Sequence, residues 1–239
     1  MTYIIKFFFC GIICAFLFPP FFLFPLGFLV FPYLYFLLKD KKIQIENKFI
    51  QFIYGTTFGL GISIIVLYWV REPFLFNPAT TDYSLLSLLL PFYIAIYFGF
   101  VFLILSFFKN DFTKLIMMPV VFVLAEIIRE NYLFGFPWIT FAVVASGNYY
   151  FLQLFYFIGT NGLSFVLILL FLVPVSIFLL KENKTKYYSK IYLIFSFNIL
   201  LVLSFLMFTK LNFLYDSSDK IEINFSINQL NISQSDKLN

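Results

Sequence analysis

The uncharged run LLSLLLPFYIAIYFGFVFLILSFF, from Leu85 to Phe108, decides the fold class of this sequence. A helix needs about 20 consecutive apolar residues to cross the roughly 30 Å hydrocarbon core of a bilayer, and this run is longer. Its apolar residues follow one another without the alternation that a membrane-spanning β-strand shows, which favours a helix over a barrel. The run therefore predicts a transmembrane helix.

Further apolar segments lie on both sides of this run. Together with it, the predicted membrane segments are 4–18, 21–38, 49–70, 85–108, 115–128, 155–180 and 191–209. The whole chain is 62% hydrophobic and 12% charged, with a mean hydropathy of +0.95, whereas a soluble domain has about 25% charged residues. We therefore expect an all-α integral membrane protein with about seven transmembrane helices.

The distribution of lysine and arginine orients these segments. If the N-terminus lies in the cytoplasm, most of the 16 basic residues fall on the cytoplasmic side, as the positive-inside rule prefers. The basic residues that fall outside are then Arg71, Arg129, Lys210, Lys220 and Lys237. The net charge of +4 is explained by this topology, and no nucleic-acid partner is expected.

The last part of the chain differs in pattern from the rest. Residues 1–209 form the predicted polytopic membrane domain, and residues 210–239 form an outer tail. Over 221–227 of this tail, apolar and polar residues alternate, which is typical of a strand with one apolar face. The alternative is a disordered polar tail in which the alternation is accidental.

Few residues of this sequence can carry catalysis. It has no histidine, which removes the usual general base near neutral pH and the commonest metal ligand. Cys10 and Cys14 lie one helical turn apart in the first segment, and the simplest interpretation is that both are small buried side chains. No zinc spacing and no glycine-rich phosphate loop is present. We expect no metal and no cofactor, and assign no catalytic residue.

The charged residues near the end of the fifth segment allow two interpretations. Glu126 and Arg129 lie three residues apart, so both project from one face of a helix. Ionisable groups in a membrane segment are costly and usually face a partner or a polar cavity. The pair either handles a lipid headgroup near the outer interface or forms an ion pair that ends the helix.

Aromatic and glycine residues predict how the segments end and pack. Gly135, Phe136, Pro137 and Trp138 form a turn followed by an aromatic residue, and tryptophan prefers the headgroup level of a membrane. Trp69, at the end of the third segment, is interpreted in the same way.

Several glycines indicate close helix packing. They are Gly55, Gly59 and Gly61 in the third segment, and Gly159 and Gly162 in the sixth.

In ordered matches along nearly the whole chain, the sequence resembles the bacterial apolipoprotein N-acyltransferases. The strongest match is Glu126-x-x-Arg129 followed by Gly135-Phe136-Pro137-Trp138. The others are Ala15-Phe16, Pro19-Pro20, Pro25-Leu26, Pro32, Gly55, Gly59, Tyr68-Trp69-Val70, Gln153-Leu154, Gly159, Gly162, Ser164-Phe165 and the tail segment 229–237.

The resemblance implies a membrane bundle that carries an outer nitrilase-like α/β domain. In that family a Glu-Lys-Cys triad of the outer domain moves an acyl chain from a phospholipid to the N-terminal amine of a lipoprotein's diacylglyceryl-cysteine. It also implies a bacterial inner membrane location, a cytoplasmic N-terminus, and phospholipid and lipoprotein partners. The periplasmic tail, 210–239, is then the start of an incomplete nitrilase-like domain, and its alternating segment resembles the first strand of that domain. The candidate lipid or substrate interface then consists of Glu126, Arg129, Gly135, Phe136, Pro137, Trp138 and Trp69.

The sequence also departs from that family. No stretch of it matches the triad, and Cys10 and Cys14 lie in the first segment, so we expect a truncated chain without activity of its own. Leu238 stands where a tryptophan is typical, and Glu130 where glycine is frequent.

Three hypotheses stay open. In the first, the chain is half of an acyltransferase, and a separately encoded nitrilase-like catalytic domain acts in trans. In the second, it is a decayed remnant. In the third, it is a non-enzymatic membrane protein such as a small transporter or lipid-binding subunit. The absence of a clear internal repeat counts against a transporter.

Overall fold

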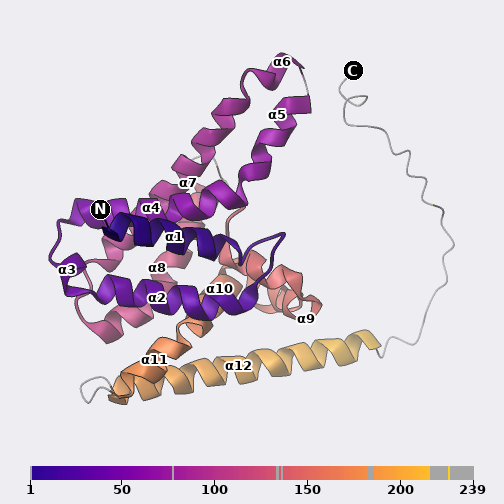
Figure 1. The fold of residues 1–239 in the computed structure, drawn as a ribbon. Helices are drawn as coiled ribbons and strands as arrows, with labels where there is room; N and C mark the ends of the chain where they lie inside the picture. The colour runs from indigo at the N-terminus through magenta and orange to yellow at the C-terminus, as the bar shows by residue number, and fades with distance from the viewer. Residues whose placement is uncertain are drawn as a thin grey trace.

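The computed structural model describes residues 2–76, 78–132, 135, 137–181, 186–215 and 226. In this described part all regular structure is helical (Figure 1). The α-helices are α1 (Thr2–Ala15), α2 (Gly27–Lys39), α3 (Lys41–Gln44), α4 (Lys48–Val66), α5 (Glu72–Phe76), α6 (Pro78–Thr81), α7 (Leu89–Leu105), α8 (Asp111–Asn131), α9 (Tyr149–Leu152), α10 (Leu154–Phe171), α11 (Val173–Leu179) and α12 (Lys186–Tyr215). The 3₁₀-helices are η1 (Phe24–Leu26), η2 (Tyr68–Arg71), η3 (Ser84–Leu88) and η4 (Phe141–Gly147).

Every predicted membrane segment contains helix. In chain order they correspond to α1, α2, α4, α7, α8, the α10–α11 pair and α12. The last helix extends beyond the predicted end of the membrane domain at residue 209, as far as Tyr215. The predicted strand at 221–227 lies outside the described residues, apart from Ser226.

Four of these helical segments are long and apolar enough to cross a membrane: 48–66, 84–105, 154–179 and 187–208. Helix α1 and the η1–α2 segment are apolar but shorter. Helix α8 is 21 residues long but differs in composition, because it carries Lys114, Glu126, Arg129 and Glu130 within its length.

The outward surfaces of the helices are also apolar. Large side chains that are about half exposed or more include Leu29, Phe49, Phe100, Phe197 and Phe205. A soluble monomer rarely exposes apolar surface on this scale. The all-α integral membrane fold expected from the sequence is confirmed.

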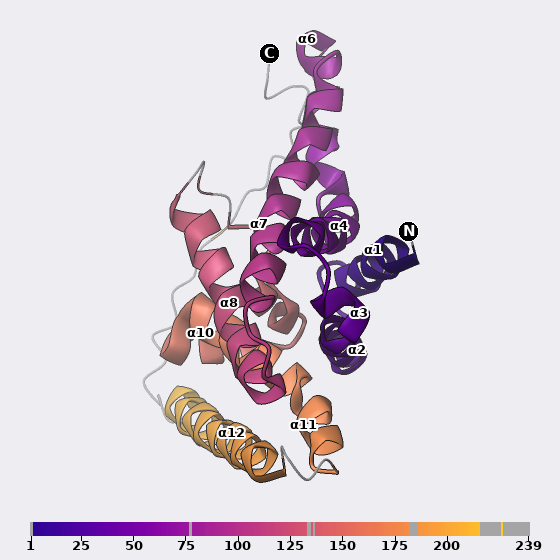
Figure 2. The same ribbon diagram turned by 90° about the vertical axis from the view of Figure 1, so that its left-hand side faces the viewer.

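Close packing between α1, α4 and α7 depends on glycine. A Cβ atom on Gly55 would meet the carbonyl oxygen of Phe98 on α7, and one on Gly61 would meet the carbonyl oxygen of Phe8 on α1. Helix α4 therefore lies tightly against α1 and α7, and Figure 2 shows the three side by side. The predicted packing role of Gly55, Gly59 and Gly61 is confirmed.

The same prediction is wrong for Gly159. A Cβ atom there would meet nothing within 4 Å, and the backbone has φ 64° and ψ −178° inside α10. This conformation is essentially restricted to glycine, so Gly159 allows a kink in the helix. A Cβ atom on Gly162 would first meet Ile158 of its own helix.

Phenylalanine fills the centre of the bundle. The ring of Phe31 on α2 packs against Phe122 on α8, Phe141 on η4 and Phe171 on α10, with centroids 5.3–5.8 Å apart. All four side chains are buried. Helix α12 lies along one side of the bundle next to α10 and α11 (Figures 1 and 2).

Cys10 and Cys14 are both buried and unbridged in α1, as the sequence predicted.

Candidate functional site

The stretch that joins α8 to η4, together with the first residues of η4, lies in the interior of the bundle. Ile139, Thr140, Phe141 and Ala142 are each at most 2% exposed, and η4 begins within this stretch. In a bilayer, irregular backbone is tolerated only where protein or a water-filled cavity satisfies its N–H and C=O groups. The partners of this segment therefore matter for the fold.

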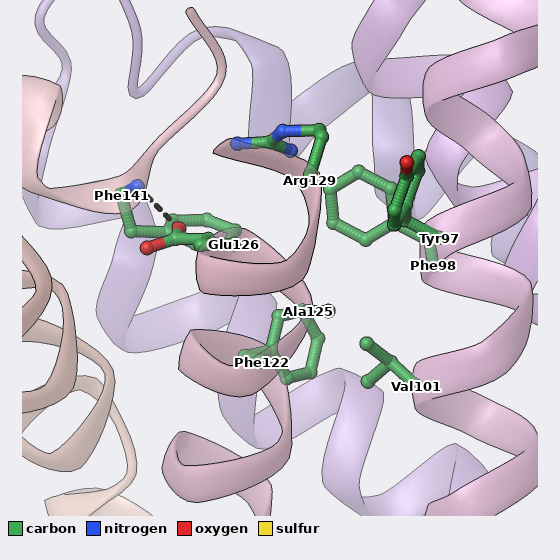
Figure 3. Close-up of a pocket in the computed structure, with 8 residues that line it drawn as sticks. All are labelled: Tyr97, Phe98, Val101, Phe122, Ala125, Glu126, Arg129 and Phe141. Atoms are coloured by element: carbon green, nitrogen blue, oxygen red, sulfur yellow. Dashed lines mark hydrogen bonds between the residues drawn. The ribbon is translucent and has the colours of Figure 1, made fainter. Parts of the chain in front are cut away.

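The two charged residues predicted near the end of α8 supply these partners. The backbone N–H of Phe141 donates to Oε1 of Glu126 at 2.8 Å (Figure 3). The guanidinium group of Arg129 donates to the carbonyl oxygen of Ile139. Both side chains are buried, at 3% and 1% exposure. Glu126 and Arg129 therefore hold the backbone on both sides of Thr140.

Ser164 on α10 completes this set. Its hydroxyl oxygen accepts a hydrogen bond from the backbone N–H of Ala142 at 2.8 Å, and the serine is fully buried. Three side chains from two helices thus bind three backbone groups of residues 139–142. We call Glu126, Arg129 and Ser164 the anchor residues.

The space next to the anchor residues is small. A cavity of about 10 Å³ is lined by α7 residues such as Tyr97 and Val101 and by α8 residues that include Glu126 and Arg129 (Figure 3). A volume of about 10–15 Å³ holds a single water molecule. A lipid headgroup therefore has no room beside these two charges in this structure.

The exposed part of the predicted interface is aromatic. The rings of Trp69, in η2, and Trp138 stack with centroids 4.6 Å apart and an interplanar angle of 22°. Both indoles are about half exposed, at 46% and 47%. Trp138 directly precedes Ile139, so Arg129 fixes the backbone next to the ring. We call this end of the bundle the tryptophan end.

The remaining predicted residues lie in the turn before Trp138. Gly135 has φ 55° and Pro137 is exposed, which suits a turn. Phe136 lies outside the described residues. Contact of any of these residues with lipid or substrate stays a prediction.

Polar contacts at the opposite end of the bundle connect α8 to α2. Lys39 pairs with Asp111 at 3.0 Å, and Nζ of the buried Lys114 donates to the carbonyl oxygen of Leu38 at 3.0 Å. We call this end the lysine end.

Asp40 belongs to the same end, in the turn after α2. Its carboxylate accepts a hydrogen bond from the hydroxyl of Tyr3 at 2.7 Å and another from the backbone N–H of Lys42. These two bonds hold the pKa of the Asp40 carboxyl below its usual range.

Comparison with known families identifies the family of this chain. A family model described as the apolipoprotein N-acyltransferase N-terminal domain matches residues 10–173, which is more than half of the chain. The chain belongs to this family. The match contains all three anchor residues and both tryptophans. No curated protein matches the chain.

Two residues of this candidate site were not among those predicted to form it. Ser164 appeared in the sequence only as part of the family resemblance, and Phe141 was not singled out. The available signal was the apolar character of residues 139–145, which is unusual for a loop that follows a turn with Gly135 and Pro137.

Proposed function

We propose that this chain is the membrane part of an apolipoprotein N-acyltransferase system in a bacterial inner membrane. It holds lipid at its tryptophan end for a nitrilase-like catalytic domain. In the reaction, an acyl ester bond of a phospholipid breaks and an amide bond to the N-terminal amine of diacylglyceryl-cysteine forms. The family match over residues 10–173 supports this substrate class.

The single observation that carries the proposal is the Trp69–Trp138 stack. Two half-exposed indoles at the end of a membrane bundle suit the headgroup region, where tryptophan is enriched. The anchor residues fix the backbone beside Trp138, so the stack is a preformed surface. Glu126 and Arg129 act in this proposal through that backbone, without touching the lipid.

Orientation and activity follow from the same proposal. The lysine end faces the cytoplasm under the positive-inside rule, so the tryptophan end faces the periplasm. The polypeptide 1–239 alone has no acyl transfer activity, because its two cysteines are buried in α1.

Two assays test the proposal. The chain contains only two tryptophans, so a phospholipid brominated near its headgroup should quench most of the emission in vesicles, whereas one brominated at the chain end should not. Stronger quenching by the chain-end bromine would contradict a headgroup-level surface.

The second assay measures N-acylated lipoprotein by mass spectrometry. We expect no product from this chain alone, and product when a nitrilase-like catalytic domain of the family is supplied in trans. N-acylation by the chain alone would refute the proposal that catalysis requires the nitrilase-like domain. Quenching as expected, but no product with the added domain, would favour a non-enzymatic lipid-binding subunit.

A further inference from the structure

An apolar groove runs between α1 and α2, on the surface of the bundle. It has a volume of about 670 Å³, which is within the roughly 300–1,000 Å³ of pockets that hold a small ligand. Its floor is formed by the buried residues Cys10 and Val30, whose Sγ and carbonyl oxygen lie 4.0 Å apart. Phe9 and Leu29, both more than half exposed, form its walls.

The groove exists because α1 packs mainly on another helix. Gly11 and Gly61 allow the backbones of α1 and α4 to approach closely, since a Cβ atom on either would meet the other helix. At the lysine end, however, the hydroxyl of Tyr3 is bonded to Asp40 after α2, at 2.7 Å. Helix α1 is thus held against α4 along its length and connected to α2 at one end.

The lining of the groove is polarised along its length. Helices α1 and α2 follow each other in the chain and run antiparallel, so Lys6 and Tyr33 lie toward the lysine end, and Ile13 and Leu26 toward the other. The stretch from Lys6 to Ile13 is about 10 Å long at 1.5 Å per residue. One end therefore presents a cation and a hydroxyl group, and the rest presents only apolar atoms and the Cys10 thiol.

The charge of Lys6 is available to a ligand. Its Nζ lies 5.2 Å from the centroid of the Tyr3 ring, and the ion pair found among the described residues joins two others, Lys39 and Asp111. The nearby Asp40 carboxylate is already bonded to Tyr3 and to the N–H of Lys42. Asp40 also attracts Lys6 electrostatically, but no close ion pair joins the two among the described residues. A phosphate would therefore meet a lysine that is not held in a close ion pair.

We propose that this groove binds one anionic phospholipid, whose phosphate lies at Lys6 and Tyr33 and whose acyl chain lies along Phe9, Leu29 and Ile13. The lipid belongs to the leaflet at the lysine end, so the site is separate from the surface at the tryptophan end. It does not depend on the proposed function.

Native mass spectrometry of the purified full chain tests this site. After delipidation, the protein is titrated with phosphatidylglycerol or with phosphatidylcholine. One lysine near an anionic lipid contributes about fivefold in affinity. We expect one phosphatidylglycerol to bind about fivefold more tightly than phosphatidylcholine, and Lys6→Gln to remove this preference.

Two further variants make the result specific. Lys41→Gln removes an exposed lysine at the same end that does not line the groove, and should leave the preference intact. Leu29→Trp fills the groove and should weaken binding of both lipids. Equal loss in Lys6→Gln and Lys41→Gln, or unchanged binding in Leu29→Trp, would overturn the proposal.

Discussion

The two ends of α8 both bury charged side chains that bind backbone groups, but the groups differ in kind. At the lysine end, Lys114 binds the carbonyl oxygen of Leu38, near the end of a complete helix. At the tryptophan end, Arg129 binds the carbonyl oxygen of Ile139, which precedes η4, and Glu126 binds the N–H of Phe141, the first residue of that short 3₁₀-helix. The Lys114 contact adds to a helix that is already complete. The Glu126 and Arg129 contacts hold in place a chain segment that has few other backbone partners.

This difference predicts which charged residues matter most. An unpaired carbonyl at a helix end can be satisfied by water or by a tighter last turn. The connection from α8 into η4 is buried inside a membrane bundle and lacks these alternatives. The tryptophan end should therefore be far more sensitive to substitution than the lysine end.

The largest expected effect is that of Arg129→Met. It leaves the Ile139 carbonyl without this donor and the Glu126 charge without its neighbour, and breaking a buried charged contact costs about 3–5 kcal/mol. Thermal unfolding in detergent measures the loss. Arg129→Lys, which keeps the charge, should lose less, and equal stability of the two variants would argue against the anchoring role.

Lys114→Met should cost less, about 1 kcal/mol, although Lys114 is as deeply buried. The lost bond to Leu38 is worth about 1.5–3 kcal/mol, but the substitution also removes the cost of burying an ammonium group. The same unfolding assay applies. A loss as large as that of Arg129→Met would remove the distinction between the two ends.

The stacking of Trp69 on Trp138 should make a smaller contribution to the free energy of unfolding. An aromatic pair is worth about 0.5–1.5 kcal/mol beyond its burial, and the partial exposure of these rings favours the lower value. A double-mutant cycle with Trp69→Leu and Trp138→Leu measures this coupling. Additive effects of the two substitutions would mean that the stack contributes nothing.

The smallest expected effect is a pH dependence at the lysine end. The pKa of Asp40 is lowered by the Tyr3 hydroxyl and the Lys42 N–H. Its contribution to the free energy of unfolding is therefore present above the ordinary aspartate pKa of about 3.9, and is lost as the pH falls through the lowered pKa. Tyr3→Phe should reduce this acid-dependent loss in thermal unfolding. An unchanged pH profile would contradict the bond.

The sequence predicted the helices well because long apolar runs are a local signal that needs no partner. It also predicted that Gly61 lies at a helix contact. It could not distinguish the roles of Gly61 and Gly159. Gly61 leaves space for a neighbouring helix, whereas Gly159 allows a backbone angle that other residues rarely adopt. That difference appears only when the neighbouring helix is in place.

The candidate site was predicted only in part for the same reason. Spacing placed Glu126 and Arg129 on one helix face, but it could not show that their partners are backbone groups of residues 139–141. The stacking of Trp138 on Trp69 depends on chain segments far apart in the sequence. Nothing in the sequence distinguishes Ser164 from other serines, because its hydrogen bond to Ala142 depends on how the two segments pack in the folded chain.

The central claim is that the anchor residues hold the segment which places Trp138 on Trp69. Tryptophan emission in nanodiscs tests it most directly, because both tryptophans of the chain belong to the stack. Glu126→Gln keeps an oxygen that can accept from the Phe141 N–H, and should retain the wild-type spectrum. Glu126→Leu removes that acceptor and should shift the emission. A wild-type spectrum in Glu126→Leu, or an equal shift in both variants, would contradict the account.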